Sequence, residues 1–204
     1  EFPITETLDN FYRFADPDGF INREYTEDGT PVWSVKHPVS FITPMLAWGE
    51  LAIADSPVHA VPGRLAKVYP ALRRHHAVCR DRWRRSDGLY YSSPLGSGMD
   101  DLPRWPRGWS AEQIAKGGIP FTKEAFTPTR ADGWELWASK HAWMENWNRQ
   151  AGWIDISAAM ALDAKCLAEI ARRIGRPAEA ADYLKKYAEL KEIINRLCWD
   201  EELG

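Results

Sequence analysis

Two helical stretches near the end of the sequence, separated by Gly175 and Pro177, constrain the fold most. Apolar residues recur at helical spacing over 156–174 and again over 177–198. Glycine is favoured just after a helix and proline fits a first helical turn, so the first helix ends where the second begins. A connection this short predicts an antiparallel helix pair. The expected apolar stripes are Ile156, Met160, Leu167, Ile170, Ala171 and Ile174, then Ala180, Leu184, Tyr187, Ala188, Ile194 and Cys198.

Helical spacing also predicts three earlier helices, at residues 5–15, 44–54 and 62–85. Pro44 suits the first turn of the second helix. Pro70 lies inside the third and predicts a kink or a fresh start there. The chain is therefore expected to be mainly α-helical. The expected buried faces are Leu8, Phe11, Tyr12 and Ala15, then Phe41, Met45, Trp48, Leu51 and Ala52, then Leu65, Val68, Tyr69, Leu72, His76, Cys79 and Trp83.

A small β-hairpin is expected near residues 20–35, between the first two helices. Residues 20–25 and 31–35 read as short strands joined around Glu27-Asp28-Gly29. Arg23 and Glu24 in the first strand form either a solvated ion pair or part of a ligand site.

Length and charge exclude several classes of protein. A chain of 204 residues fits one domain or part of a larger one, and its net charge of -3 provides no general attraction to nucleic acid or acidic membranes. No apolar run is long enough to span a membrane. Three widely spaced cysteines indicate reduced thiols and a cytoplasmic location. His75 and His76 lack further residues at metal-ligand spacing, so neither a metal nor a cofactor is expected.

A short acidic loop at residues 96–104 carries the most chemistry. Its two glycines, Gly96 and Gly98, allow the backbone a close approach to a ligand, and a carboxylate pair follows. The same residue types are common in exposed turns, which is the alternative. Aromatic residues flank the loop on both sides, and flat rings stack on the apolar faces of sugars. The loop is therefore a candidate carbohydrate site.

Tryptophans are concentrated after this loop. The sequence has eleven, and seven of them fall from Trp105 to Trp153. Residues 106–150 are predicted to form an excursion over the site, because long segments with little periodicity are commonly lids or binding loops. A helix at 133–149 within it has tryptophans on two faces, which suits either a ligand contact or plain core packing.

The loop sequence Ser97-Gly98-Met99-Asp100-Asp101-Leu102-Pro103-Arg104 resembles the acid-bearing loop of glycoside hydrolase family 63 and, more distantly, that of the trehalases. The resemblance implies that Asp100 is the general acid. Asp101 stands where the family more often has asparagine.

Two further segments resemble the family in the same order along the chain. Residues 18–25 are similar to its Gly-x-Ile-x-Arg-Glu segment, and residues 152–157 to its Trp-Val-Asp-Leu segment. Residues 42–44 depart from the family, which often has Gln-Pro-Pro there, so a polar ligand contact is in doubt. The substrate-binding residues that the resemblance implies are Phe20, Arg23, Glu24, Gly98, Asp101, Arg104, Trp105 and Trp153.

The resemblance implies an inverting α-glycosidase on an (α/α)6 toroid, acting on α-glucosides or glycosylglycerates. The family's base is a glutamate far downstream of the acid, and no segment of this chain matches that region. Residues 1–204 are therefore expected to be part of one catalytic domain, bound to a small carbohydrate and to the remainder of the toroid or another copy of the chain. A related sugar phosphorylase and a non-catalytic helical binding module are the alternatives.

Overall fold

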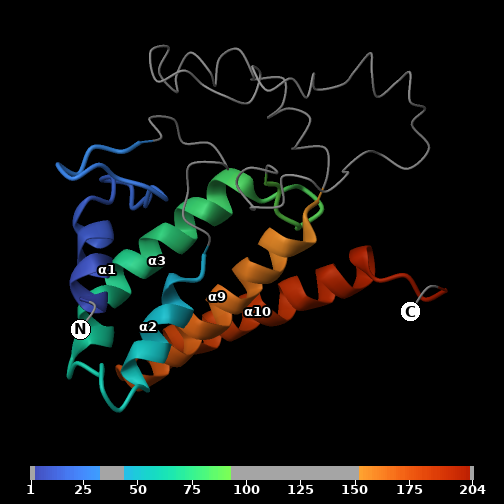
Figure 1. The fold of residues 1–204 in the computed structure, drawn as a ribbon. Helices are drawn as coiled ribbons and strands as arrows, with labels where there is room; N and C mark the ends of the chain where they lie inside the picture. Colours follow the sequence, from blue (N-terminus) through green and yellow to red (C-terminus); the bar gives the residue numbers. More distant parts are fainter. Residues whose placement is uncertain (1–2, 33–43, 93–151, 203–204) are drawn as a thin grey trace, which may run out of the picture.

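The computed structural model describes residues 3–32, 44–92 and 152–202. These residues contain five helices and no strand, which confirms the mainly α-helical prediction (Figure 1). The helices are α1 (Ile4–Arg13), α2 (Leu46–Ala54), α3 (Arg64–Trp83), α9 (Ile154–Arg173) and α10 (Pro177–Cys198). None of these helices is long and apolar enough to cross a membrane.

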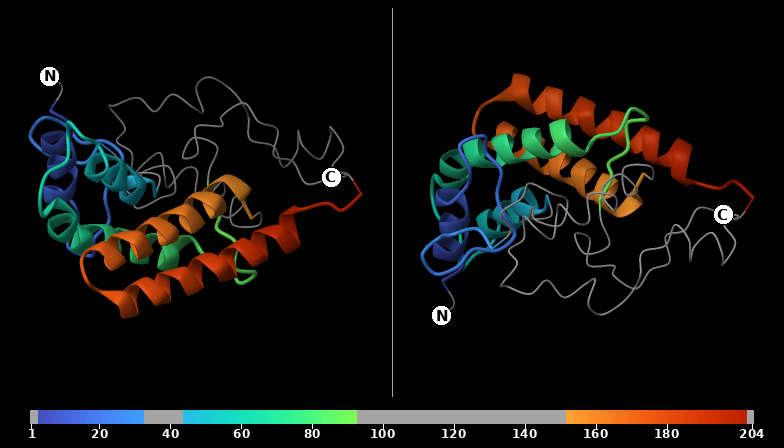
Figure 2. Two further views of the ribbon diagram at one scale, coloured as in Figure 1. Left: turned by 90° about the horizontal axis from the view of Figure 1, so that it is seen from below. Right: turned by 90° about the horizontal axis from the view of Figure 1, so that it is seen from above.

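Helices α9 and α10 form the predicted antiparallel pair and lie side by side in both views of Figure 2. Gly175 between them has a φ of 77°, the left-handed conformation that favours glycine. The Gly175 N–H bonds the Arg172 carbonyl at 3.2 Å, and the Arg176 N–H bonds the Ala171 carbonyl at 2.8 Å. These two bonds satisfy carbonyls of the last turn of α9, as in a Schellman motif.

The buried stripe of α10 differs in part from the expected one. Tyr183 and Leu190 are buried, whereas Leu184 is 51% exposed. The stripe of α9 is as predicted and extends further, because Asp163 and Ser157 are buried with it. A pattern of apolar residues cannot reveal which polar side chains are buried beside them.

Helix α3 runs from Arg64 to Trp83 without ending at Pro70, so the fresh start allowed by the sequence does not occur. Its buried residues include six of the seven expected, and Leu65 is partly buried. The six are Val68, Tyr69, Leu72, His76, Cys79 and Trp83.

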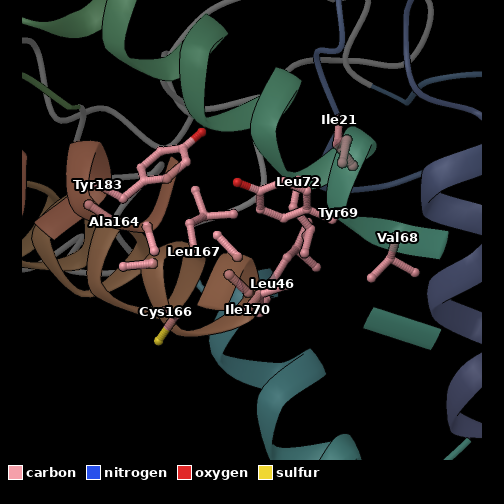
Figure 3. Close-up of a cluster of buried hydrophobic side chains, with 14 residues drawn as sticks. Ile21, Leu46, Val68, Tyr69, Leu72, Ala164, Cys166, Leu167, Ile170 and Tyr183 are labelled. Atoms are coloured by element: carbon pink, nitrogen blue, oxygen red, sulfur yellow. The ribbon is translucent and has the colours of Figure 1, made fainter. Parts of the chain in front are cut away.

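One buried cluster joins α2, α3, α9 and α10 (Figure 3). Leu46 of α2, Tyr69 and Leu72 of α3, and Leu167 and Ile170 of α9 lie together at its centre. Helix α1 adds the partly buried stripe predicted from the sequence, which packs against this cluster. The cluster is the core that holds the described helices in place.

Helix α2 buries the face opposite to the expected one. Met45 is 40% exposed and Trp48 is 52% exposed, whereas Leu46, Ala47, Glu50 and Ile53 are buried. Of the other expected residues, Leu51 is partly buried against the core and Phe41 lies outside the described residues. The cause is Glu50, which is 0% exposed and accepts two hydrogen bonds from the Arg64 guanidinium, at 2.6 and 2.8 Å. Because Glu50 is charged, its face of α2 resembles a solvent-exposed face in the sequence.

Glu50 and Arg64 belong to an ion cluster, which we define as Asp9, Tyr12, Glu50, Arg64 and Lys67. Tyr12 donates its hydroxyl to Glu50 at 2.7 Å, and Arg64 and Lys67 donate to the two oxygens of Asp9 at 2.9 and 2.6 Å. Burial, and then the charge of Glu50, raise the pKa of Tyr12, so its phenol keeps its proton. The cluster ties α1, α2 and α3 together.

Of the expected hairpin, the residues up to 32 that the structure describes form a tight turn. Tyr25 and Pro31 form one antiparallel bridge, and the Val32 N–H bonds the Glu24 carbonyl at 3.1 Å. Asp28 accepts hydrogen bonds from the Thr26 hydroxyl and the Thr30 N–H, which lower the pKa of Asp28 to about 2. Residues 33–35 of the expected second strand lie outside the described residues.

Candidate functional site

The segment from Asp16 to Glu24 lies against the middle of α3. Gly19 has a φ of 96°, and a Cβ atom there would approach the Cβ of Arg74 to 2.3 Å. Only glycine therefore permits this contact between the segment and the helix. The Gly19 N–H bonds the Asp16 carbonyl, and the Asp16 N–H bonds the Phe20 carbonyl, each at 2.8 Å.

His75 fixes the next residue. The Ile21 N–H donates to Nδ1 of His75 at 3.2 Å, and both residues are buried. The Asn22 N–H then donates to the Tyr25 hydroxyl at 2.9 Å, and the Glu24 N–H donates to Oδ1 of Asn22 at 3.2 Å. The backbone preceding and following Arg23 is thus held by side chains, while the Arg23 and Glu24 side chains are exposed.

Aromatic side chains form a second buried cluster beside this segment. Phe20 packs on Trp83 of α3 with ring centroids 6.0 Å apart, and its edge meets the His75 ring at 6.4 Å. Trp153, at the start of α9, belongs to the same cluster. The other large members are Tyr90, Tyr91, Ile156, Met160 and Leu190.

The chain before residue 93 and the chain after residue 151 meet at Tyr90. The Tyr90 N–H donates to the Ser157 hydroxyl at 3.0 Å, and the Tyr90 carbonyl accepts from the Trp153 N–H at 2.8 Å. The Gly152 backbone packs so closely on Leu89 that a Cβ would come within 2.4 Å of a Leu89 methyl carbon. The segment that carries Asp100 therefore starts and ends at one fixed place.

Four of the predicted site residues are described. Phe20 and Trp153 lie in the same aromatic cluster and are only 2% and 4% exposed, whereas Arg23 and Glu24 are at the surface. The remaining five, and the excursion at 106–150, lie outside the described residues. These five are Gly98, Asp100, Asp101, Arg104 and Trp105.

The two adjacent histidines of α3 face different elements. Nδ1 of His76 lies 2.7 Å from Oδ2 of Asp163 on α9, and both side chains are buried. His76 lines a hollow of about 20 Å³ with Arg80, Arg84 and Lys186, which has room for about one water and not for a sugar. In the part of the chain that the structure describes, no three metal-ligand residues are grouped.

Sequence reasoning missed the residues that fix this frame. His75, Ser157 and the Tyr25 hydroxyl all bind backbone N–H groups, and no apolar pattern marks such a role. Tyr25 and Ser157 lie within the segments 18–25 and 152–157, which could have singled them out, whereas His75 lies in neither.

Comparison with known proteins agrees with the resemblance seen in the sequence. The mannosylglycerate hydrolase MGH1-like glycoside hydrolase domain matches residues 6–204. No curated protein and no solved structure matches the chain. The match spans all three segments that resemble glycoside hydrolase family 63 and confirms that likeness. The chain therefore belongs to the mannosylglycerate hydrolase MGH1-like glycoside hydrolase family.

Proposed function

We propose that this protein is an inverting α-glycosidase of α-glucosides or glycosylglycerates, with Asp100 as its general acid. The observation that carries the proposal is the family match over residues 6–204, which includes the loop with Asp100. Membership of a glycoside hydrolase family already implies a carbohydrate substrate. We further propose that residues 1–204 are part of one (α/α)6 catalytic domain.

The chemistry requires two carboxyl groups. One is protonated and donates its proton to the leaving oxygen; the other deprotonates a water on the opposite face of the sugar, and the two lie roughly 6.5–9.5 Å apart. Asp100 is the donor in this proposal. Asp101 beside it would favour the protonated form of Asp100, because a neighbouring negative charge raises the pKa of a carboxyl group. The water-activating carboxylate is not assigned to a residue of this chain.

The described residues around Tyr90 support this role. The aromatic cluster with Phe20 and Trp153 is buried, so its part is to form a rigid base for the site. The exposed Arg23 and Glu24 side chains are the groups we expect to bind sugar hydroxyls, since charged groups make strong hydrogen bonds. We propose that the excursion at 106–150 completes the pocket, together with Gly98, Arg104 and Trp105, which precede it in the sequence.

The test is the turnover of two substrates by two variants of the full-length enzyme. Asp100→Asn keeps the shape of the side chain but removes the proton. Hydrolysis of a natural glycoside should fall by about 10²–10⁴-fold, the usual contribution of general acid catalysis. A glycosyl fluoride has a leaving group that needs no proton, so its hydrolysis should be largely spared.

Asp101→Asn is the matched control, because it makes the same chemical change one residue away. It should have a far smaller effect on both substrates. Loss of glycoside turnover in Asp101→Asn but not in Asp100→Asn would show that the acid is wrongly assigned.

A further inference from the structure

The segment that carries Arg23 and Glu24 is attached to α3 at several points, one of which is the ion pair between Asp18 and Arg82 at 3.2 Å. Gly19 lies against Arg74, the Ile21 N–H bonds His75, and the Phe20 ring packs on His75 and Trp83. Among these contacts, the bond to His75 is the one in which a side chain of α3 binds a backbone N–H, two residues before Arg23.

The geometry sets the tautomer of His75. A backbone N–H can only donate, so Nδ1, which accepts it, carries no proton. The proton of the neutral ring is then on Nε2, which lies 3.7 Å from Sγ of Cys79. Burial raises the pKa of the Cys79 thiol, so the sulfur is uncharged and can accept this weak hydrogen bond.

We propose that His75, through the hydrogen bond from Ile21 to its Nδ1, is a positioning residue that holds Arg23 and Glu24 in the orientation that binds substrate. This inference rests on the proposed function. His75 is buried and lies below the segment, so it acts through the backbone and does not touch the sugar. Its loss should therefore weaken substrate binding more than it slows the chemical step.

Two substitutions at His75 separate the hydrogen bond from the space that the ring fills. His75→Phe keeps a flat ring but has no acceptor, which leaves the buried Ile21 N–H without its bond. His75→Asn places an amide oxygen near the position of Nδ1, where it can accept the same bond. KM for the glycoside should rise about tenfold in His75→Phe, the factor expected when one buried hydrogen bond is lost, and should change much less in His75→Asn.

The control is Cys79→Ala, which removes the sulfur that Nε2 contacts and leaves Nδ1 and Ile21 unchanged. Its KM should equal that of the wild type. In all three variants kcat should stay within about threefold of wild type, because the bond acts on binding. If His75→Phe does not fold, His75→Gln replaces it, since its longer amide reaches toward Nε2 instead of Nδ1.

A readout independent of activity is the ¹⁵N spectrum of the wild-type histidines. It should show His75 protonated on Nε2 alone, and the Ile21 amide signal should shift in His75→Phe but not in Cys79→Ala. A proton on Nδ1, or a wild-type KM in His75→Phe and His75→Gln, would overturn the positioning role. Failure of the proposed function is a separate result: wild-type turnover of the glycoside by Asp100→Asn.

Discussion

The helix pair α9–α10 and the corner formed by α1, α2 and α3 are held together by different means. The pair is joined by apolar side chains on both helices and a glycine turn; the buried stripe of α9 matches the sequence pattern, and that of α10 matches it only in part. The corner is joined by the ion cluster around Glu50, and there the sequence pattern indicates the wrong face of α2. A buried ion pair can therefore place a helix face inward that apolar periodicity alone does not indicate.

The strongest test of this comparison is Glu50→Ala. The substitution leaves the Arg64 guanidinium buried without Glu50, and breaking a buried ion pair in this way costs about 3–5 kcal/mol. Urea denaturation of the variant measures the loss in the free energy of unfolding. Trp48→Ala, on the exposed face of the same helix, is the control and should cost far less. Equal losses would mean that the exposed face is packed and that the corner does not depend on its charges.

A second substitution measures the apolar side of the comparison. Leu167 of α9 is fully buried at the centre of the core cluster (Figure 3). Leu167→Ala should lower the free energy of unfolding by about 2–5 kcal/mol, through lost burial and the cavity left behind. Leu184→Ala on α10, where the side chain is 51% exposed, should cost well under half as much. A larger loss at Leu184 would show that the predicted stripe of α10 was right.

The smallest expected effect is the acid sensitivity of a surface ion pair on α9. Hydrogen bonds from Arg172 and then Arg173 hold the pKa of Glu169 at about 2, below its ordinary 4.5. Because the folded pKa is the lower one, the stabilisation is present above pH 4.5 and is lost as the pH falls toward 2. As the pH falls over this range, the urea concentration at the midpoint of unfolding should fall slightly less for Glu169→Gln than for the wild type. An identical fall would mean that the exposed pair contributes nothing.

In the ion cluster, the pKa of Asp9 is lowered in the folded protein, as that of Glu169 is. Burial opposes ionisation of Asp9, but hydrogen bonds from Lys67 and Arg64 outweigh it and lower the pKa of Asp9. Acid should therefore weaken the corner as well as the surface of the helix pair. Comparison of the Asp9→Asn variant with the wild type, by urea denaturation over the same pH range, measures how much of the acid-induced loss of stability comes from Asp9.

The sequence predicted the helical class, the turn at Gly175 and most of the buried face of α3, because these depend on local spacing and turn chemistry. It placed α2 with the wrong face inward, since Glu50 is buried only by virtue of Arg64, fourteen residues away. Of the expected hairpin, the described residues show one bridge and a tight turn that side-chain bonds of Asp28 close. Partners distant in sequence leave no periodic signal.

For the candidate site, resemblance to a family indicated the segments, and the structure supplied the contacts between them. Phe20 and Trp153 were expected to bind substrate, and both lie in one buried aromatic cluster. The contributions of His75 and Ser157 are hydrogen bonds to backbone groups of residues far away in the chain. Nothing in the residue types at those positions distinguishes them from ordinary core residues.

The junction at Tyr90 has a consequence for how such a protein can change. Its bonds to Trp153 and Ser157 fix both borders of the stretch from residue 93 to residue 151. These bonds involve no residue between the borders, so a substitution within that stretch removes none of them. The attachment of this stretch to α3 and α9 is thus encoded outside it.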